Sequence, residues 1–421
     1  MINLLLADLR MKQIIALLLA FAAFNATGQN HDLEYFISHA RQYSPLLADY
    51  KNQIQAAGVD SQLIRASQKV QVNGISTNFY APTISGYGYD NIITNGGQLS
   101  AVVQASKNII TSANLASQYE TIRLMRESIG NISVLAEKDL KKTITTQYIT
   151  VYGDFQNLQF SKEILNLFQG EDNILKKLTQ GGIYKQTDYL TFYVSYQQQQ
   201  LTARQLEIQF RNDCATLNYL SGIVDTSNIT LARPDLQTNL LPDISLSPFY
   251  RQYTLDSLNL INQHKIIFYS YKPKLNVFAD AGYNSSLMST PYKNFGVSAG
   301  LNFSLPIYDG KQRKLKYQKI NIAEDTRQHY RGYFLLQYSQ QIAQLSQQLK
   351  STQALIEDIN GQIKYSETLI DVNRKLLETG EVRITDLILT INTYLNARNL
   401  LNQNYINRMQ IINQINYWQA L

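Results

Sequence analysis

Four short segments of the chain alternate between apolar and polar residues. The clearest lies at about 295–305, and its apolar positions are Val297, Ala299, Leu301, Phe303 and Leu305. The segment at about 274–284 has the same alternation, the one at about 97–107 keeps it except at Val102, and the one at about 70–80 shows it more weakly. A period of two over about ten residues predicts a strand with one apolar and one polar face.

The strands are expected in two pairs, each followed by a long helical region. Gly- and Asn-rich links within each pair predict a β-hairpin with a longish loop. No proline lies between Pro82 and Pro234 or after Pro306. Because proline breaks helices, we expect a helical hairpin at about 111–222 and another at about 311–420. At 1.5 Å per residue, about 70 helical residues would form a rod of about 100 Å.

The second half of the chain repeats the first. Gly182, Thr187 and Asp188 recur 198 residues later as Gly380, Thr385 and Asp386. Other matches keep the same offset, among them Lys177-Leu178 with Lys375-Leu376 and Asn218-Tyr219 with Asn416-Tyr417. A constant offset over more than a hundred residues indicates a tandem duplication. We therefore predict a first structural repeat at 29–240 and a second at 241–421.

Each helical hairpin is expected to turn at a glycine. Gly182 and Gly380 suit the left-handed cap that ends a helix, and Thr187 and Thr385 suit the N-cap of the returning helix. Shorter helices near 33–67 and 247–271 lead into the two strand pairs. Ile356, Ile359, Ile363, Ile370 and Leu377 have a spacing similar to that of a coiled coil.

The N-terminus has the pattern of a secretory signal peptide. Met11-Lys12 precedes an apolar run from Ile14 to Phe24, and small residues follow at Ala26-Thr27-Gly28. The run is too short to span a bilayer. We predict a signal peptide at 1–28, with Met11 or Met1 as the start, rather than a buried helix. No Cys follows the cleavage site, so no lipid anchor is expected there.

Composition and charge narrow the class of protein further. Charged residues make up 17%, against about 25% in typical soluble domains. The net charge of +6 is mild for 421 residues and does not indicate a nucleic-acid partner. The mean hydropathy of −0.24 argues against a bundle of transmembrane helices. One Cys excludes an intrachain disulfide.

The residues offer little for catalysis or for holding a metal. The four His residues, His31, His39, His264 and His329, do not have metal-ligand spacing. Cys214 lies among apolar residues and is expected to be a small core residue. Phosphate-binding loops, nucleophile elbows and zinc-protease motifs are missing from the sequence. We therefore expect no enzyme activity, cofactor or metal site, and energy for any transport would come from a partner.

Four strands with an apolar face cannot close a membrane barrel alone, because lipid does not tolerate open strand edges. Bacterial single-chain barrels begin at eight strands. Copies of the chain must then share one barrel, with eight strands from two copies or twelve from three. Several tyrosines near the predicted strand ends fit an aromatic girdle or ordinary loops, namely Tyr80, Tyr87, Tyr89, Tyr283 and Tyr292.

The order of these elements resembles the TolC-type outer-membrane efflux proteins. The run from Gly300 to Gly310, Pro273-Lys274-Leu275 and the two Gly-x4-Thr-Asp tips carry the resemblance. It implies a mainly α fold with membrane β: a homotrimer with a trimeric α-barrel in the periplasm and four strands per chain in a shared twelve-stranded β-barrel in the outer-membrane lipid. It also implies a passive exit duct of a tripartite efflux or type I secretion system. The expected partners are a periplasmic adaptor and an inner-membrane pump of the RND or ABC type.

The resemblance further places Asp188 and Asp386 at the periplasmic entrance, where three copies would present six carboxylates that favour cations. Helix capping is the alternative role for both acids. Some members carry a second acid, a Tyr and an Arg where this chain has Leu389, Leu377 and Val382, so their closed-state locks are not expected here. Lys185 and Arg383, at matched positions, are candidates to pair with the acids.

A basic cluster from Lys311 to Lys316 follows the last predicted strand. It could anchor the barrel rim near anionic head groups, or it could be a solvated first helical turn. Two other classes of protein also stay open. A periplasmic adaptor would need one hairpin flanked by two half-domains of short strands. A structural coiled-coil protein of the cell surface, without a pore, would leave the four alternating strands unexplained.

Overall fold

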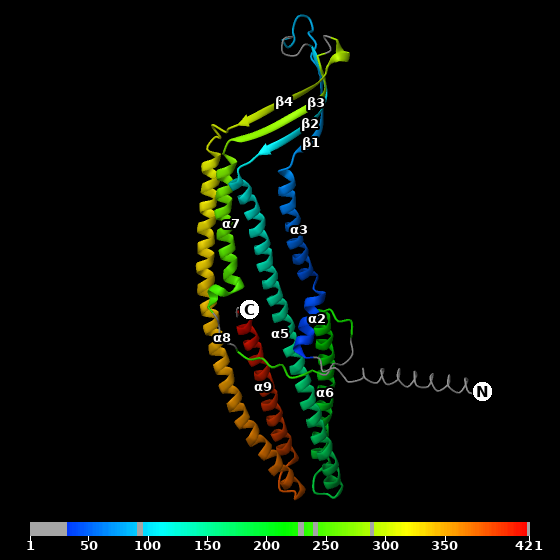
Figure 1. Cartoon of the computed structure of the whole chain (residues 1–421). Helices are drawn as coiled ribbons and strands as arrows, with labels where there is room; N and C mark the ends of the chain where they lie inside the picture. Colours follow the sequence, from blue (N-terminus) through cyan, green and yellow to red (C-terminus); the bar gives the residue numbers. More distant parts are fainter. Residues whose placement is uncertain (1–31, 91–95, 226–230, 239–242, 287–289, 419–421) are drawn as a thin grey trace, which may run out of the picture. The chain divides into compact units, whose positions relative to one another are not determined.

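In the computed structural model the residues described are 32–90, 96–225, 231–238, 243–286 and 290–418. The predicted signal peptide and His31 lie outside them. Long helices and one four-stranded sheet make up the fold (Figure 1). The elements, in chain order, are α2 (Leu33–Tyr43), α3 (Pro45–Ser67), β1 (Gln71–Tyr80), β2 (Gly97–Ile109), α5 (Ser112–Gln180), α6 (Gln186–Ser221), η1 (Ile244–Leu246), α7 (Pro248–Ser270), β3 (Lys274–Ser285), η2 (Pro291–Lys293), β4 (Phe295–Ser304), α8 (Gln312–Glu378) and α9 (Ile384–Tyr417).

The four strands and the two long helical hairpins lie where the sequence patterns predict them. Helices α5 and α6 fill the first proline-free interval, and α8 and α9 fill the second. The helix expected near 33–67 is instead two helices, because Pro45 interrupts it. The residue before a proline is pushed out of the helical region, and Ser44 is extended with ψ 113°. Pro45 then serves as the first residue of α3.

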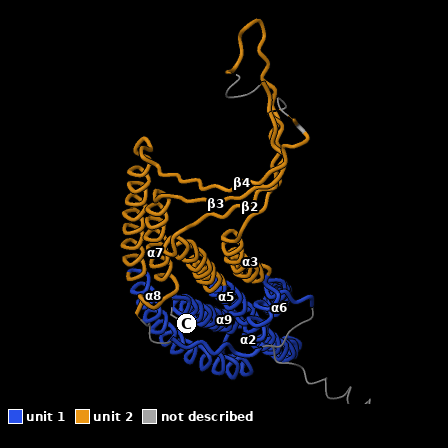
Figure 2. The backbone as a smooth tube through the Cα atoms, turned by 45° about the horizontal axis from the view of Figure 1, so that its top comes forward, with its two compact units in different colours: residues 1–44, 137–241, 340–419 blue, residues 45–136, 242–339, 420–421 orange. Residues whose placement is uncertain are grey.

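The chain divides into two compact units (Figure 2). Unit 1 consists of residues 1–44, 137–241 and 340–419, and it contains the hairpin tips. Unit 2 consists of residues 45–136, 242–339 and 420–421, and it contains the sheet. Each unit therefore takes segments from both predicted repeats. The division into successive repeats at 29–240 and 241–421 stays a prediction about the origin of the sequence.

The sheet of unit 2 is an antiparallel meander in the order β1-β2-β3-β4. Its register brings the apolar positions of neighbouring strands together, for example Val277 opposite Leu301 and Ala281 opposite Val297. These side chains are not covered by the rest of the described chain. Val297 is 85% exposed, Leu301 is 71% exposed and Phe303 is 64% exposed. The sheet thus presents an uncovered apolar face.

The opposite face of the sheet carries most of the polar side chains of β2, β3 and β4, and several of them form hydrogen bonds between strands. Three of them join neighbouring strands: Ser298 Oγ donates to Asp280 Oδ1 (2.8 Å), Asn276 Nδ2 to Asn108 Oδ1 (2.7 Å), and Gln98 Nε2 to Asn284 Oδ1 (3.2 Å). Such cross-strand pairs stabilise a sheet by a few tenths of a kcal/mol to about 1 kcal/mol each. The two faces therefore differ in polarity along β2, β3 and β4. The register puts Ile75 and Phe79 of β1 on the polar face and Ser76 and Asn78 on the apolar face, in keeping with the weaker alternation of this strand.

The helices of unit 1 bury several apolar clusters. One joins α2, α5 and α6 around Phe36, Tyr148 and Leu217, and it includes Cys214, which is buried as expected. A second, near the hairpin tips, is formed by Phe168, Phe192, Leu377, Ile384 and Leu387, with further residues of all four long helices. Burying side chains of this size stabilises the folded chain by about 1.5–3 kcal/mol each. In the part of the chain that the structure describes, no helix is long and apolar enough to cross a membrane.

Candidate functional site

The tips of the two helical hairpins have the same backbone turn. Helices α5 and α8 end at left-handed glycines, Gly182 with φ +80° and Gly380 with φ +79°. In each turn the glycine donates its N–H to the carbonyl three residues earlier, and the next residue donates to the carbonyl five residues earlier. This pair of bonds is the Schellman motif, and glycine suits its left-handed position because it has no Cβ. Both glycines therefore have the conformation that the sequence predicts.

The predicted N-caps at Thr187 and Thr385 are wrong. Helices α6 and α9 begin directly after Lys185 and Arg383, whose extended backbones (ψ 151° and 148°) put them at the cap position without a side-chain cap bond. The reason is that the chain re-enters a helix almost immediately after the glycine turn, two residues earlier than the threonines. The threonines consequently lie inside the first helical turn.

The two tip acids have different surroundings. Arg383 donates from Nε and Nη2 to the two carboxylate oxygens of Asp386, at 3.1 and 3.0 Å. The hydrogen bond raises the pKa of Arg383 above its usual value. Among the described residues no such ion pair joins Lys185 to Asp188. The pairing predicted for the matched positions is thus present at the second tip only, where Arg383 is 81% exposed and the pair adds little stability.

A hydrogen bond that sequence reasoning missed joins the two tips. The hydroxyl of Tyr184 lies 2.7 Å from the carbonyl oxygen of Val382 and 3.0 Å from that of Leu377. Tyr184 and Val382 occupy matched positions in the two repeats. At this matched position the first tip has a hydroxyl donor, whereas the side chain of Val382 at the second tip cannot form a hydrogen bond. This asymmetry between the repeats is the sequence signal that could have pointed to the contact.

A partly buried ion pair joins α5 and α8 near the ends that lead into the tips. The Glu171 side chain in α5 is 1% exposed, and its Oε1 accepts a hydrogen bond of 2.5 Å from Arg374 Nε in α8. Burial raises the pKa of Glu171, and the nearby Arg374 opposes that rise. Removing one member of such a pair leaves an uncompensated charge, which is strongly destabilising. This pair therefore holds α5 against α8.

Two acids of α5 and α6 face each other further along unit 1. Burial, together with the neighbouring acid Asp213, raises the pKa of Asp154 to about 7. Asp213 accepts from Gln147 Nε2 at 3.2 Å and from Gln209. Two carboxyl groups at close quarters favour protonation of one of them. Asp154 therefore keeps its proton to a higher pH than an ordinary aspartate, which no sequence motif revealed.

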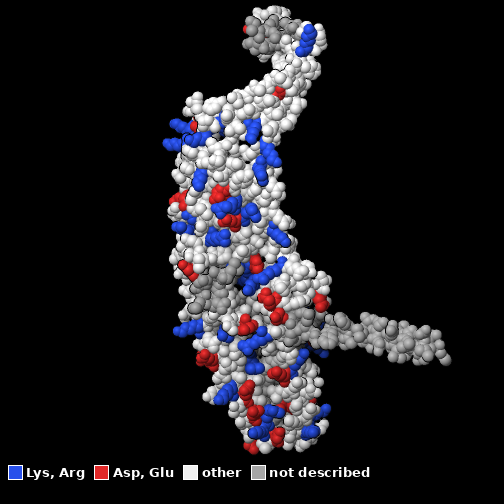
Figure 3. Space-filling view, viewed as in Figure 1, with Lys and Arg blue, Asp and Glu red and all other residues white. Residues whose placement is uncertain are grey.

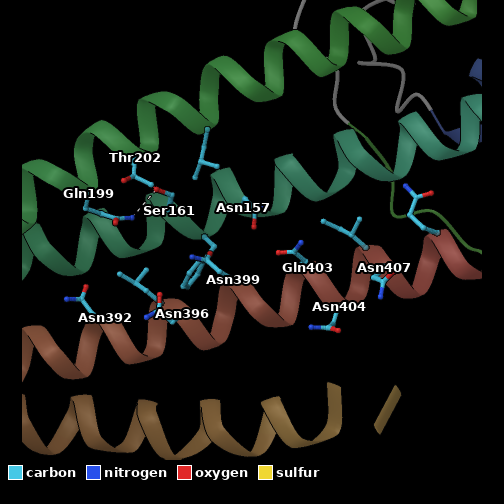
Figure 4. Close-up of a pocket in the computed structure, with 15 residues that line it drawn as sticks. Asn157, Ser161, Gln199, Thr202, Asn392, Asn396, Asn399, Gln403, Asn404 and Asn407 are labelled. Carbon is cyan, nitrogen blue, oxygen red and sulfur yellow. Dashed lines mark hydrogen bonds between the residues drawn. The ribbon is translucent and has the colours of Figure 1, made fainter. Parts of the chain in front are cut away.

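A groove of about 1040 Å³ runs along α5, α6 and α9 in unit 1 (Figure 4). It is lined by two hydroxyl side chains, four apolar ones and no charged ones. Amide side chains are the largest group in its lining: Asn157, Gln199, Asn392, Asn396, Asn399, Gln403, Asn404, Asn407 and Gln410. The groove therefore offers many donors and acceptors without net charge.

Most of these amides come from one face of α9. The spacing of Asn392, Asn396, Asn399, Gln403 and Asn407 by three or four residues places them along a single stripe. All five are exposed, and no hydrogen bond to another described residue occupies them. Elsewhere in the groove Gln199 Nε2 donates to Ser161 Oγ at 3.2 Å. The stripe is thus free to bind water or a polar solute.

The remaining candidates from the sequence have structural surroundings. His39 Nδ1 lies 2.9 Å from the Ser221 carbonyl oxygen, and His264 stacks on Tyr317. His329 is exposed beside Asp325. Within the described ranges no group of three or more His, Cys, Asp or Glu side chains could hold a metal ion.

Comparison with known proteins places this geometry in a group of similar structures. No protein-family model and no curated protein sequence matches the chain. Solved structures do match it over nearly its whole length. The outer membrane protein VceC from Vibrio cholerae has a TM-score of 0.72 at 13% identity, covering 92% of this chain and 96% of that chain. The Campylobacter jejuni CmeC outer membrane channel has a TM-score of 0.69 at 14% identity, with 92% and 85% covered.

A third match is the open state of the Neisseria gonorrhoeae MtrE outer membrane channel, with a TM-score of 0.71 at 11% identity and coverage of 92% and 88%. This chain has the TolC-type fold. The mainly α fold with four strands per chain is therefore confirmed, and the trimeric α-barrel and the shared twelve-stranded β-barrel stay predictions. The gating roles of Asp188, Asp386, Lys185 and Arg383 stay predictions, because a similar fold does not carry over the roles of single residues.

Proposed function

We propose that this protein is an outer-membrane channel that serves as a passive exit duct for cargo from the periplasm. The observation that carries the proposal is the sheet, whose apolar face is uncovered and whose outer strands β1 and β4 each have one unpaired edge. Exposed apolar side chains in an aqueous setting are unfavourable, whereas lipid accommodates them. The strands contain 10 to 13 residues, a length that suits a membrane-spanning strand.

Closure of the barrel requires more than one copy. Open strand edges are not tolerated in lipid, so β4 of one copy pairs with β1 of the next. That pairing continues the antiparallel meander of the single chain. Three copies give twelve strands, and the TolC-type fold favours this homotrimer over a dimer of eight strands.

Two of the long helices offer matching contact surfaces for such a ring. Figure 4 shows α6, α5, α9 and α8 side by side in that order. The outermost two, α6 and α8, carry exposed apolar side chains at helical spacing, on α6 Leu190, Val194, Leu201 and Ile208 and on α8 Leu355, Leu369 and Val372. Rows of this kind are typical of helix-packing seams. We infer that α6 of one copy packs on α8 of the next and builds an α-barrel in the periplasm.

A duct of this kind needs partner proteins that bring the cargo to it and supply the energy for transport. It has no nucleotide-binding motif, so an inner-membrane pump of the RND or ABC type supplies energy. A periplasmic adaptor connects that pump to the hairpin tips. Efflux of small molecules and secretion of polypeptides are both compatible with such a duct.

At the tips we propose that Asp188 and Asp386 line the periplasmic entrance and bind cations there. The support is their matched position in two identical turns. Replacing both with Asn should weaken the block of channel current by divalent cations. Unchanged block in planar-bilayer recordings would leave both acids with a local role in the first turn of their helices.

The channel itself is tested by moving charges between the two faces of β4. The double variant Val297→Lys/Leu301→Lys puts two cations on the apolar face, where each costs about 2–4 kcal/mol at the bilayer midplane. It should fail to insert into vesicles and to conduct. The matched control Ser298→Lys/Asn302→Lys changes the neighbouring positions on the polar face, and it should insert and conduct. Equal insertion by both variants would show that the face does not contact lipid.

A further inference from the structure

Basic side chains gather in unit 2 where the strands meet the helices. Lys69, Lys107, Lys272 and Lys274 lie at or beside the strand ends nearest the helices, and Lys311, Arg313, Lys314, Lys316 and Lys319 lie at the start of α8. We refer to these nine residues as the basic belt. All nine are exposed. Figure 3 shows Lys and Arg side chains with little acid among them at this level.

The acids of the same region do not neutralise the basic belt. Between residues 264 and 319 the only acids are Asp280 and Asp309. Asp280 accepts a hydrogen bond from Ser298 within the sheet. Asp309 Oδ2 accepts the backbone N–H of Arg313 at 2.7 Å and so caps the start of α8. The region therefore has a strong excess of positive charge.

Aromatic rings hold several of these cations in place. The Arg313 guanidinium lies 5.6–5.8 Å from the ring centres of Phe268, Tyr271 and Tyr317. Lys272 Nζ lies 4.5 Å from the Phe268 ring, and Lys316 Nζ lies 5.4 Å from the Tyr271 ring. Contacts of this kind orient a cation while its other donors stay available to an anion.

Apolar side chains stand beside the cations and are open to their surroundings. Ile307 is 94% exposed and Tyr308 is 84% exposed, directly before the basic residues of α8, and Leu315 within them is 59% exposed. Cations next to exposed aromatic and aliphatic groups are typical of chains that lie at the boundary between lipid headgroups and acyl chains. A free phosphate ion would use the cations and leave these apolar groups without a function.

We propose that the basic belt binds the phosphate groups of anionic phospholipids in the leaflet that faces the helices. Lys311, Arg313 and Lys314 surround one headgroup in the open groove of about 640 Å³ that they line with Tyr317 and Asp309. Ile307 and Tyr308 contact the acyl region beside it. The inference rests on the proposed function, in which the sheet spans the membrane.

The test measures which lipids stay bound to the full-length protein. The protein is reconstituted in vesicles of phosphatidylcholine with a minor share of phosphatidylglycerol, extracted gently, and its bound lipids are counted by native mass spectrometry. The variant Lys311→Gln/Arg313→Gln/Lys314→Gln removes three cations of the basic belt. The control Lys350→Gln/Lys364→Gln/Lys375→Gln removes three exposed cations from α8 outside it.

The wild type and the control should hold phosphatidylglycerol well above its share in the vesicle. The belt variant should lose that enrichment, by about five-fold for each cation removed, and high salt should reduce it in the wild type. Equal enrichment in the belt variant, or none in the wild type, overturns the proposal. Displacement of the lipid by millimolar inorganic phosphate also overturns it, because the ligand would then be the free anion.

Failure of this inference can be told apart from failure of the proposed function. Conductance is recorded in parallel in bilayers of pure phosphatidylcholine. A protein that inserts and conducts there without lipid enrichment keeps its channel function and loses the assigned lipid site. A protein that does not insert in any bilayer loses both.

Discussion

Single side chains determine how firmly the two hairpin tips are tied together within one chain. Tyr184 provides a hydroxyl donor for two backbone carbonyls of the second tip. An intramolecular hydrogen bond of this kind contributes about 0.5–1.5 kcal/mol. Because any movement of one tip away from the other must break it, this contact contributes to the free-energy cost of separating the two tips.

Tyr184→Phe should therefore loosen the second tip. We expect amide hydrogen exchange across residues 377–383 to become about five-fold faster, as loss of about 1 kcal/mol implies. Tyr365→Phe is the control, since Tyr365 is 79% exposed on α8. The same exchange rates in Tyr184→Phe and in the control would contradict a tie between the tips.

The acid pair of unit 1 makes stability depend on pH. Burial and Asp213 raise the pKa of Asp154 to about 7, above the value of about 3.9 expected in the unfolded chain. The folded state thus holds the proton more tightly, and the resulting stability is present at low pH and is lost as the pH rises through about 7.

Asp154→Asn should remove this part of the pH dependence. Between about pH 5 and about pH 8 the unfolding free energy of the wild type should fall by roughly 1–2 kcal/mol more than that of the variant. The figure is kept small because water partly screens Asp154. Thermal unfolding followed by circular dichroism measures it, with the exposed acid change Asp358→Asn as control. A parallel pH profile of wild type and Asp154→Asn would contradict the assignment.

The contacts of single residues were harder to predict from the sequence than the elements that carry them. Gly182 and Gly380 could be predicted, since a left-handed turn needs glycine. The Arg383–Asp386 pair was predicted from the matched positions of the two tips, and the same reasoning predicted a Lys185–Asp188 pair that the described residues do not show. The contact of Tyr184 depends on how two segments almost 200 residues apart are brought together, and the pairing of Asp154 with Asp213 joins two different helices. Neither leaves a local pattern.

At the scale of elements, the glycine turns define where each hairpin reverses. An L-residue in the left-handed region costs about 1–2 kcal/mol. No atom lies within 4 Å of a Cβ added at Gly182, so a substitution there tests the backbone conformation alone.

Gly182→Ala should accordingly lower the unfolding free energy by about 1 kcal/mol. The matched control is Gly361→Ala in the middle of α8, where an added Cβ also meets nothing within 4 Å. Here the helical backbone suits alanine, and the substitution should stabilise the chain by about 0.5–1 kcal/mol. Thermal unfolding of both variants measures the difference, and two shifts of the same sign would contradict the turn.

Elements were the best-predicted level because their patterns are local. Period-two alternation located four strands, and the proline-free intervals located two hairpins. The break between α2 and α3 is caused by Pro45. The prediction treated 33–67 as helical throughout and did not take this proline into account. The helix starts at Lys185 and Arg383 were missed because the glycine turn, and not a capping side chain, sets where the backbone becomes helical again.

At the scale of the whole molecule, the amide-lined groove bears on the cargo that a duct would pass. The groove could not be predicted from any single stretch of the sequence, because three helices contribute the residues that line it. If the stripe of α9 faces the path of the cargo, its neutral side chains predict weak selection by charge there.

Asn396→Asp/Asn399→Asp should then make the channel more cation-selective, and the corresponding Lys pair should make it more anion-selective. Reversal potentials in a salt gradient measure the change, and we expect shifts of opposite sign. Asn360→Asp and Asn360→Lys, on the exposed surface of α8, are the matched controls and should shift the potential less. Two groove variants that shift it in the same direction would show that the stripe does not line the path.

The shared barrel is the central claim for the whole molecule, and imaging of the protein extracted from membranes by detergent tests it most directly. Electron cryomicroscopy should show a hollow three-fold assembly in which β4 of each copy pairs with β1 of the next, at the end of a tube built from the long helices. A single chain with its sheet edges covered by its own segments, or a solid rod without a central passage, would contradict both the barrel and the duct.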